Sequence, residues 1–305
     1  MGTKQGEQVM TVGIVPNTQK EKLLETVNRF LALLKENNID FLFYEGIKEI
    51  SGQMDEKLND EQILSIEELG KRSDVIVSLG GDGTMLYAAH ELRSSNAPLM
   101  GLNLGKLGFL AEFDIDSMDD FIMILKEKRF VIEERMALSA ICQGDEGNDL
   151  YAINDVVIDK GKWQRMIEIS ITVDGDYVST FAADGLIIAT PTGSTGYSLS
   201  TGGPVVHPSA DVITLSPISP HSLTMRPLVI SSKQRITVEV KSQHENIQIN
   251  CDGQRVYNYS SPISVEVFKS DNPVRLVHSI KSDYFQTLRN KLYWGLDVRK
   301  NNSIQ

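Results

Sequence analysis

The chain has 305 residues, of which 41% are hydrophobic, so it can bury a substantial core, and we expect two domains. Its formal net charge is −11 without an offsetting basic block, which disfavours nucleic acids and anionic membranes as partners. No apolar run approaches the roughly 20 residues that cross a bilayer, and the opening segment MGTKQGEQVM lacks the apolar centre of a signal peptide, so we expect a cytoplasmic protein.

The first part of the chain alternates predicted strands with predicted helices. The strands are expected at residues 11–15, 41–44, 75–79 and 98–102, the helices at 19–37 and 85–93, and a polar surface loop at 45–60. This alternation predicts an open, Rossmann-like α/β domain, in which ligands bind beyond the carboxyl ends of the strands.

A glycine-rich turn, Gly80-Gly81-Asp82-Gly83-Thr84, follows the buried-looking strand at 75–79. Glycines let backbone N–H groups approach an anion, and the helix N-terminus behind them adds a favourable dipole, so a phosphate fits here. Because a carboxylate repels phosphate, we expect Asp82 to handle a hydroxyl proton or a metal ion. The alternative is a plain β-to-α turn in which Asp82 caps the helix.

The segment NLGKLGFL at 103–110 follows the next strand and is therefore expected on the ligand side. Its glycines permit close approach, Phe109 can stack on a base, and Lys106 can meet a phosphate. The pattern fits a plain loop with Phe109 in the core equally well.

From about residue 133 the helical periodicity disappears and short β-rich runs follow one another. They lie at 138–142, 152–158, 167–173, 186–189, 236–240, 247–250 and 263–268. These runs predict an all-β domain of the β-sandwich type. Helical spacing returns at 284–293, which indicates that the tail packs back onto the first domain. We therefore expect an N-terminal domain over 1–132, completed by 272–305, and a β-rich domain over 133–271.

Within the β-rich part, the segment ADGLIIATPTGSTGYSLSTGGP at 183–204 leads an apolar strand into a run of small hydroxyl residues and glycines. Such donors and acceptors can surround ribose hydroxyls, phosphates and an adenine edge, and Tyr197 can supply an aromatic wall. Composition alone favours an ordinary loop.

Seven motifs together resemble the NAD kinase family and run in the family's order over nearly the whole chain. They are LGGDGT at 79–84, LGKLGFL at 104–110, AINDVVI at 152–158, DGLIIATPTGSTGYSLSTGGP at 184–204, HSLTMRPL at 221–228, DGQ at 252–254 and YFQTLRNKLYWG at 284–295. The GGDGT turn alone is shared with diacylglycerol and sphingosine kinases and 6-phosphofructokinases, but those proteins do not carry the segment at 184–204.

The resemblance implies transfer of the γ-phosphate of ATP to the 2′-hydroxyl of the adenosine ribose of NAD⁺, with Asp82 as general base. Asn154 and Asp155 occupy the positions of an Asn-Glu pair that holds the ligand, and Asp155 is one methylene shorter than the usual residue. Asp184 would accept from the nicotinamide carboxamide. Gly196 replaces a more usual alanine, which loosens the turn without changing its character.

The implied sites can be given in full. The residues expected to bind NAD are Asp82, Gly83, Phe109, Asn154, Asp155, Arg165, Ala182, Asp184, Thr192, Thr195, Gly196, Tyr197, Ser198, Leu199, Ser200 and Gln254. Those expected to bind phosphate are Gly80, Gly81, Gly83 and Thr84.

A divalent metal ion, Mg²⁺ in our expectation, would be carried by the phosphates of ATP, because the sequence shows no protein cage for it. None of the five histidines has metal-ligand spacing, and Cys142 and Cys251 form no CxxC motif. The resemblance implies a homodimer or homotetramer and leaves polyphosphate open as a second donor. Two alternatives stay open: a lipid kinase that shares only the GGDGT turn, and a non-catalytic NAD(P)-binding sensor.

Overall fold

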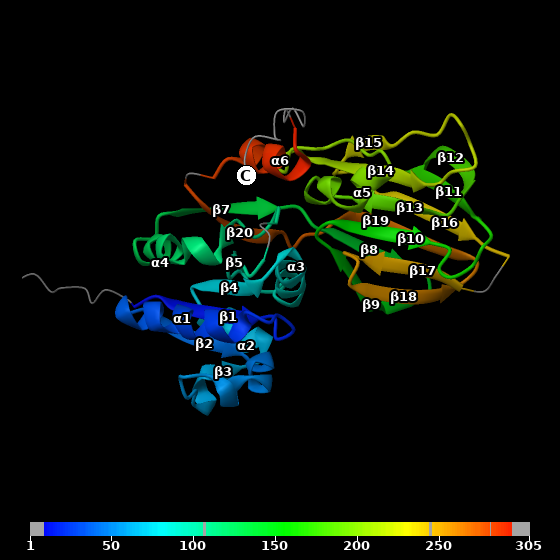
Figure 1. Ribbon diagram of the computed structural model, residues 1–305. Helices are drawn as coiled ribbons and strands as arrows, with labels where there is room; N and C mark the ends of the chain where they lie inside the picture. The colour runs from blue at the N-terminus through cyan, green and yellow to red at the C-terminus, as the bar shows by residue number, and fades with distance from the viewer. Residues whose placement is uncertain (1–8, 106–107, 244–245, 281, 295–305) are drawn as a thin grey trace, which may run out of the picture. The chain divides into compact units, whose positions relative to one another are not determined.

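The structure is a computed structural model that describes residues 9–105, 108–243, 246–280 and 282–294 (Figure 1). The chain divides into two compact units. Unit 1 comprises 1–88, 95–133 and 276–305, and unit 2 comprises 89–94 and 134–275. The predicted fold class, an α/β part followed by an all-β part, is confirmed.

Unit 1 is built on one sheet with the strand order β3-β2-β1-β4-β5-β20-β7, and β6 pairs with β5. The pairs β1–β2, β1–β4, β4–β5 and β5–β20 are all parallel. The strands are β1 (Thr11–Pro16), β2 (Asp40–Tyr44), β3 (Ile63–Leu64), β4 (Val75–Gly80), β5 (Leu99–Asn103), β6 (Phe113–Asp114), β7 (Phe130–Arg135) and β20 (Val274–Ser279).

The helices of unit 1 form where apolar residues recur at helical spacing. In α1 (Leu23–Glu36), Leu23, Val27 and Leu34 are buried on one face, against the same core as the β1 residues Val12 and Ile14. The other helices are α2 (Ile66–Arg72), α3 (Asp82–Glu91), α4 (Met118–Lys126) and α6 (Tyr284–Leu292). The predicted tail helix is confirmed as α6, which groups with unit 1.

Two expectations for unit 1 were wrong. The stretch at 45–60 contains the 3₁₀ helices η1 (Glu45–Glu49), η2 (Ser51–Gln53) and the start of η3 (Asp60–Gln62), and it buries Ile47 and Met54. The apolar residues Ile47, Ile50, Met54 and Leu58 recur at helical spacing, but the many polar residues between them led to the prediction of a loop. The helix expected at 85–93 begins three residues earlier, at Asp82.

Unit 2 contains two sheets of six strands, in the orders β15-β14-β13-β10-β17-β18 and β12-β11-β16-β19-β8-β9. Their buried faces share one core, to which alternate residues such as Ile169 and Ile171 contribute from one sheet and Ile247 and Ile249 from the other. The predicted sandwich is therefore confirmed (Figure 1).

The strands of unit 2 are β8 (Leu138–Cys142), β9 (Asp145–Ala152), β10 (Asp155–Asp159), β11 (Ile167–Val173), β12 (Asp176–Ala183), β13 (Gly185–Ala189), β14 (Val212–Ile218), β15 (Leu228–Ser231), β16 (Ile236–Lys241), β17 (Asn246–Cys251), β18 (Arg255–Ser260) and β19 (Ile263–Lys269). Five of them, β9, β12, β14, β15 and β18, were not predicted. The run of hydroxyl residues at 192–200 folds into η5 (Thr192–Thr195) and the short helix α5 (Tyr197–Ser200).

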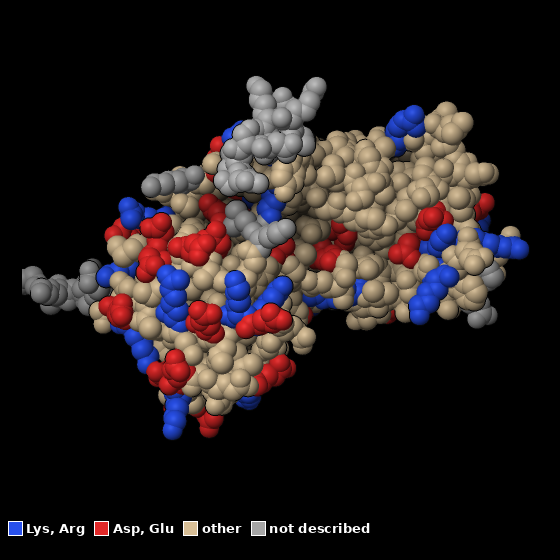
Figure 2. Space-filling view, viewed as in Figure 1, with Lys and Arg blue, Asp and Glu red and all other residues tan. Residues whose placement is uncertain are grey.

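Charged side chains are distributed differently over the two units (Figure 2). Acidic and basic residues alternate over the visible face of unit 1, whereas few charges lie over β14 and β15 of unit 2. None of the helices among the described residues is long and apolar enough to span a membrane.

Candidate active site

The turn between β4 and α3 is closed by the side chain of Thr84. Its hydroxyl oxygen accepts hydrogen bonds from Asn17 Nδ2 at 3.1 Å and from the Gly81 N–H at 3.4 Å. A Cβ on Gly80 would lie 2.0 Å from that oxygen, so only glycine fits where the strand ends. The N–H groups of Gly81 and Thr84 both bond within the turn, and the phosphate contacts expected of Gly80, Gly81, Gly83 and Thr84 stay predictions.

The carboxylate of Asp82 is held by three consecutive backbone donors. Oδ2 accepts the N–H of Phe109 at 2.7 Å, and Oδ1 accepts those of Leu110 at 3.2 Å and Ala111 at 3.1 Å. Asp82 is half-buried at the first position of α3. Its carboxylate therefore has a fixed orientation while part of its surface stays accessible to a ligand.

The segment at 103–110 thus has a contact that its sequence did not predict. Its backbone turns toward Asp82, and a Cβ on Gly108 would lie 1.7 Å from Asp82 Oδ1. The side chain of Phe109 is half-buried, and its predicted contact with NAD stays a prediction. Lys106 lies outside the described residues.

A Gly108→Ala substitution tests this arrangement. The new methyl group would displace the Asp82 carboxylate, so we expect kcat to fall by about 10²-fold or more, the range associated with a misplaced general base. Gly52→Ala is the control, because no atom lies within 4 Å of the added Cβ there. Steady-state kinetics of both folded variants give the result, and equal kcat values would contradict the requirement for Gly108.

In unit 2, the segment Ile153-Asn154-Asp155 is held by the carboxylate of Asp252. Oδ1 accepts the N–H groups of Ile153 at 2.9 Å, Asn154 at 2.7 Å and Asp155 at 3.3 Å, and Oδ2 accepts that of Ile153 at 3.0 Å. In return, the Asp252 N–H donates to the Asp155 carbonyl at 3.0 Å. Two predicted ligand-binding residues, Asn154 and Asp155, therefore sit on a backbone that a third side chain fixes.

Asp155 itself is 5% exposed. Burial, and then the neighbouring charge of Asp252, raise the pKa of the Asp155 carboxyl to about 7. Burial also raises the pKa of Asp252, but the three N–H donors and the positive charge of Arg255 oppose that shift. The repulsion from Asp252 therefore favours a proton on Asp155, while the donors around Asp252 favour its charged form.

The stretch that follows β13 packs on the same segment. Thr190 donates its hydroxyl proton to the Ile153 carbonyl at 2.6 Å, and its N–H donates to the Asn154 carbonyl at 2.9 Å. A Cβ on Gly193 would lie 2.0 Å from the Asn154 carbonyl oxygen. A Cβ on Gly196 would lie 4.0 Å from Asp155 Oδ2. The structure therefore brings the predicted residues Asn154, Asp155 and Gly196 together.

The hydroxyl residues of η5 and α5 mostly bond within the protein. Ser198 is fully buried, with its hydroxyl 3.0 Å from that of Ser216, and Thr195 donates to the Thr192 carbonyl at 3.3 Å. Tyr197, in contrast, is 48% exposed. The ring of Tyr197 is consequently free to stack on a ligand, whereas Ser198 anchors the turn.

Asp184 has a partner that the sequence did not predict. Its carboxylate lies 2.5 Å from the ammonium of Lys160, and both side chains are partly buried. The carbonyl of Ala182 accepts the His221 N–H at 2.8 Å. Asp184 thus carries an internal counter-ion, and its predicted contact with the nicotinamide carboxamide would have to be made beside Lys160.

The remaining predicted NAD contacts lie at the surface. Arg165 is exposed and hydrogen-bonded to Gln243, and the Gln254 N–H donates to the Cys251 carbonyl at 3.1 Å. Leu199 is half-buried and Ser200 is exposed. The described residues contain no group of three or more His, Cys, Asp or Glu side chains that could hold a metal ion.

The raised pKa of Asp155 gives a prediction for stability. The folded protein holds this proton up to about pH 7, whereas the unfolded chain loses it near the ordinary aspartate pKa of 3.8, so stability falls as pH rises between these values. Asp155→Asn removes the group, and we expect it to raise the free energy of unfolding by about 4 kcal/mol at pH 8 and by little at pH 4. Denaturant unfolding at both pH values is the measurement, and a loss of stability in the variant at pH 8 would contradict the assignment.

Comparisons with known proteins match both units. Residues 12–129 match the family "ATP-NAD kinase N-terminal domain", and residues 153–279 match "ATP-NAD kinase C-terminal domain". The chain is 37% identical over 287 residues to an NAD kinase of Chloroherpeton thalassium, covering 94% of this chain and 98% of that protein. It is 36% identical over 291 residues to an NAD kinase of Natranaerobius thermophilus, covering 94% and 99%.

Two solved structures are similar in fold. An NAD kinase from Archaeoglobus fulgidus in complex with ATP has a TM-score of 0.74 and 27% identity, and the match covers 93% of this chain and 99% of that one. A yeast NADH kinase complexed with NADH has a TM-score of 0.84 and 24% identity, covering 97% and 89%. The second likeness concerns the fold alone.

Proposed function

We propose that this chain, which belongs to the ATP-NAD kinase family, transfers the γ-phosphate of ATP to the 2′-hydroxyl of the adenosine ribose of NAD⁺, giving NADP⁺ and ADP. The observation that carries the proposal is the fixed carboxylate of Asp82 inside a motif set that matches the family over both units. Relatives at 36% and 37% identity named NAD kinases support the activity.

Asp82 acts as the general base. A ribose hydroxyl is a weak nucleophile at neutral pH, so a positioned carboxylate that takes its proton during attack on phosphorus accelerates the reaction by about 10²- to 10⁴-fold. The three backbone donors at 109–111 keep the carboxylate in one orientation, which supports this assignment.

The NAD contacts in unit 2 follow from the same proposal. Asn154 and Asp155 bind the hydroxyl and diphosphate region, and the raised pKa of Asp155, about 7, reduces the repulsion that a fully ionised carboxylate would exert on a diphosphate. Tyr197 stacks on a ring of the ligand, and Asp184 accepts from the nicotinamide carboxamide. A divalent ion such as Mg²⁺, bound to the phosphates of ATP, would neutralise charge on the transferred group.

The alternatives have less support. A lipid kinase would share the turn at 80–84 but not the 153–279 match, and a silent sensor would not require an aligned base at Asp82. Because NAD⁺ and ATP are intracellular metabolites, we place the reaction in the cytoplasm.

Asp82→Asn tests the central assignment. The amide is similar in shape but cannot accept the ribose proton, so we expect kcat to fall by about 10²- to 10⁴-fold while NAD⁺ binding stays measurable. A coupled assay for NADP⁺ and calorimetric NAD⁺ titration give the two readouts. Unchanged turnover would contradict the role of Asp82, and phosphorylation of diacylglycerol but not NAD⁺ by the unaltered protein would favour the lipid kinase.

We also propose a homo-oligomer that forms through β15. This strand lies at the edge of its sheet, with Leu228 40% and Val229 43% exposed, under the sparsely charged face in Figure 2. An exposed edge strand with apolar side chains is a template for pairing with a second copy.

Val229→Lys should therefore reduce the molar mass measured by light scattering. Val178→Lys is the matched control, because Val178 is 39% exposed on β12, an edge strand of the other sheet. If only the Val178→Lys variant had a reduced molar mass, the interface would lie at β12 and not at β15.

A further inference from the structure

The Asp252-Gly253-Gln254 motif belongs to the sequence pattern of the family, yet the proposed function gives Asp252 no task. Asp252 is 8% exposed and lies in the turn between β17 and β18. A buried carboxylate is costly unless its lone pairs are filled, so its contacts indicate what the residue does.

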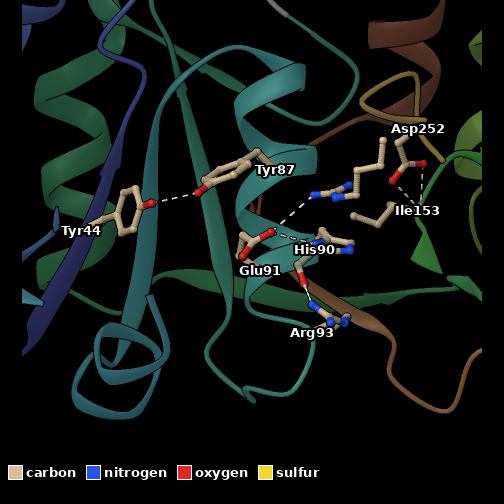
Figure 3. A network of polar contacts seen from close by, with 8 residues as sticks. Tyr44, Tyr87, His90, Glu91, Arg93, Ile153 and Asp252 are labelled. Carbon is tan, nitrogen blue, oxygen red and sulfur yellow. Dashed lines mark hydrogen bonds and ion pairs between the residues drawn. The ribbon is translucent and has the colours of Figure 1, made fainter. Parts of the chain in front are cut away.

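Among the described residues, the backbone donors to the Asp252 carboxylate come from one short segment. They are the N–H groups of three consecutive residues, Ile153, Asn154 and Asp155, at 2.7–3.3 Å from Oδ1. Figure 3 shows the Asp252 carboxylate directed at Ile153. Three N–H groups that converge on one oxygen fix the backbone angles of this segment, and with them the directions of the Asn154 and Asp155 side chains.

The backbone conformation of the turn at Asp252-Gly253 brings the Asp252 carboxylate to residues 153–155. Asp252 has φ 58° and Gly253 has φ 67°, both in the left-handed region. This region is costly for residues other than glycine, asparagine and aspartate. Aspartate and glycine adopt it readily, so this turn can place the Asp252 side chain across the start of β10 without a large backbone cost.

Neighbouring groups oppose the rise that burial gives to the pKa of Asp252. Arg255, the next residue but one after Gly253, acts on Asp252 as a positive charge, and Arg255 in turn lies 3.8 Å from Glu91. Burial keeps the thiol of Cys251 neutral by raising its pKa. Of the titratable groups around Asp155, Asp252 is the one whose charge raises the Asp155 pKa.

We propose that Asp252 is a positioning residue, whose carboxylate clamps the backbone of residues 153–155 and so presents Asn154 and Asp155 to NAD⁺. The proposal rests on the proposed function, because it needs Asn154 and Asp155 to contact the ligand. Asp252 itself touches no substrate in this account. It acts through the two residues that it orients and through its charge beside Asp155.

The first test is Asp252→Asn. Asparagine tolerates the left-handed conformation and keeps one oxygen, but hydrogen bonds to a neutral acceptor are weaker than those to a carboxylate, so we expect the Kd for NAD⁺ to rise about tenfold. Removal of the neighbouring charge should also move the midpoint of the pH dependence of Kd, near pH 7 in the unaltered protein, to lower pH. A residue that merely supports the fold would not move this midpoint.

The chain offers a matched control in the turn between β11 and β12. Asp174 has φ 52° and is followed by Gly175 at φ 87°, and Asp174 Oδ1 accepts the Arg235 N–H at 2.9 Å. Asp174→Asn therefore makes the same chemical change in the same kind of turn, away from residues 153–155. We expect it to leave Kd and its pH dependence as they are.

A second pair of variants covers the case in which Asp252→Asn does not fold. No atom lies within 4 Å of a Cβ added at Gly253 or Gly175, so alanine at either position strains only the local backbone. We expect Gly253→Ala to raise the Kd for NAD⁺ about tenfold through displacement of Asp252, and Gly175→Ala to leave it unchanged.

Calorimetric titration of NAD⁺ over pH 5–9 decides the result. A raised Kd with a lowered midpoint, confined to the Asp252 or Gly253 variants, is the expected result. An unchanged Kd or an unchanged midpoint in a folded Asp252→Asn protein would overturn the clamp, and so would an unchanged Kd in Gly253→Ala. Failure of the proposed function gives a different result, because the unaltered protein would then form no NADP⁺ in the coupled assay, whatever its Kd for NAD⁺.

Discussion

Each of the two units contains the same interaction, a carboxylate that receives N–H groups from three consecutive residues. Asp82 in unit 1 receives those of 109–111, and Asp252 in unit 2 receives those of 153–155. Such charge-assisted bonds are about twice as strong as neutral ones, and three of them to one group leave little freedom of orientation. Each unit therefore fixes one acid by means of a backbone segment distant in sequence.

The two carboxylates differ in their exposure to solvent. Asp82 stays half-buried, so a fixed charge remains accessible for chemistry at the start of α3. Asp252 is buried, and its contacts fix a segment that carries other side chains. In the proposed function, the same hydrogen-bond pattern thus orients the reacting group in one unit and the NAD-binding residues in the other. Two glycines are required by these arrangements. A side chain at Gly108 would collide with Asp82, and one at Gly193 would collide with Asn154.

The fold class could be predicted because the apolar patterns of buried strands and amphipathic helices lie within short stretches of sequence. Buried strands such as β4 are continuous apolar runs, and α1 has apolar residues on one face. Half-exposed strands such as β18, in which exposed and partly buried residues alternate, were missed because their apolar signal is weak. The stretch containing Ile47 and Met54 was predicted as a loop because its few apolar residues, although at helical spacing, lie among many polar ones.

For the site, the motifs identified the residue types but not their partners. Nothing in the residue types indicates that the N–H of Phe109 bonds to Asp82, since every residue except proline carries that donor. Lys160 was missed because it is a single cation outside any motif, and its contact with Asp184 appears only in three dimensions. The pKa of Asp155 depends likewise on burial and on Asp252, which is nearly a hundred positions later in the chain.

The most direct test of the account is a crystal structure of the protein with NAD⁺ bound, in which the distance from the Asp82 carboxylate to the ribose 2′-oxygen is measured. The account predicts about 2.6–3.2 Å, or a single bridging water, with the bonds from 109–111 retained. A 2′-oxygen beyond that reach, while the nucleotide is bound by Asn154 and Asp155, would contradict it.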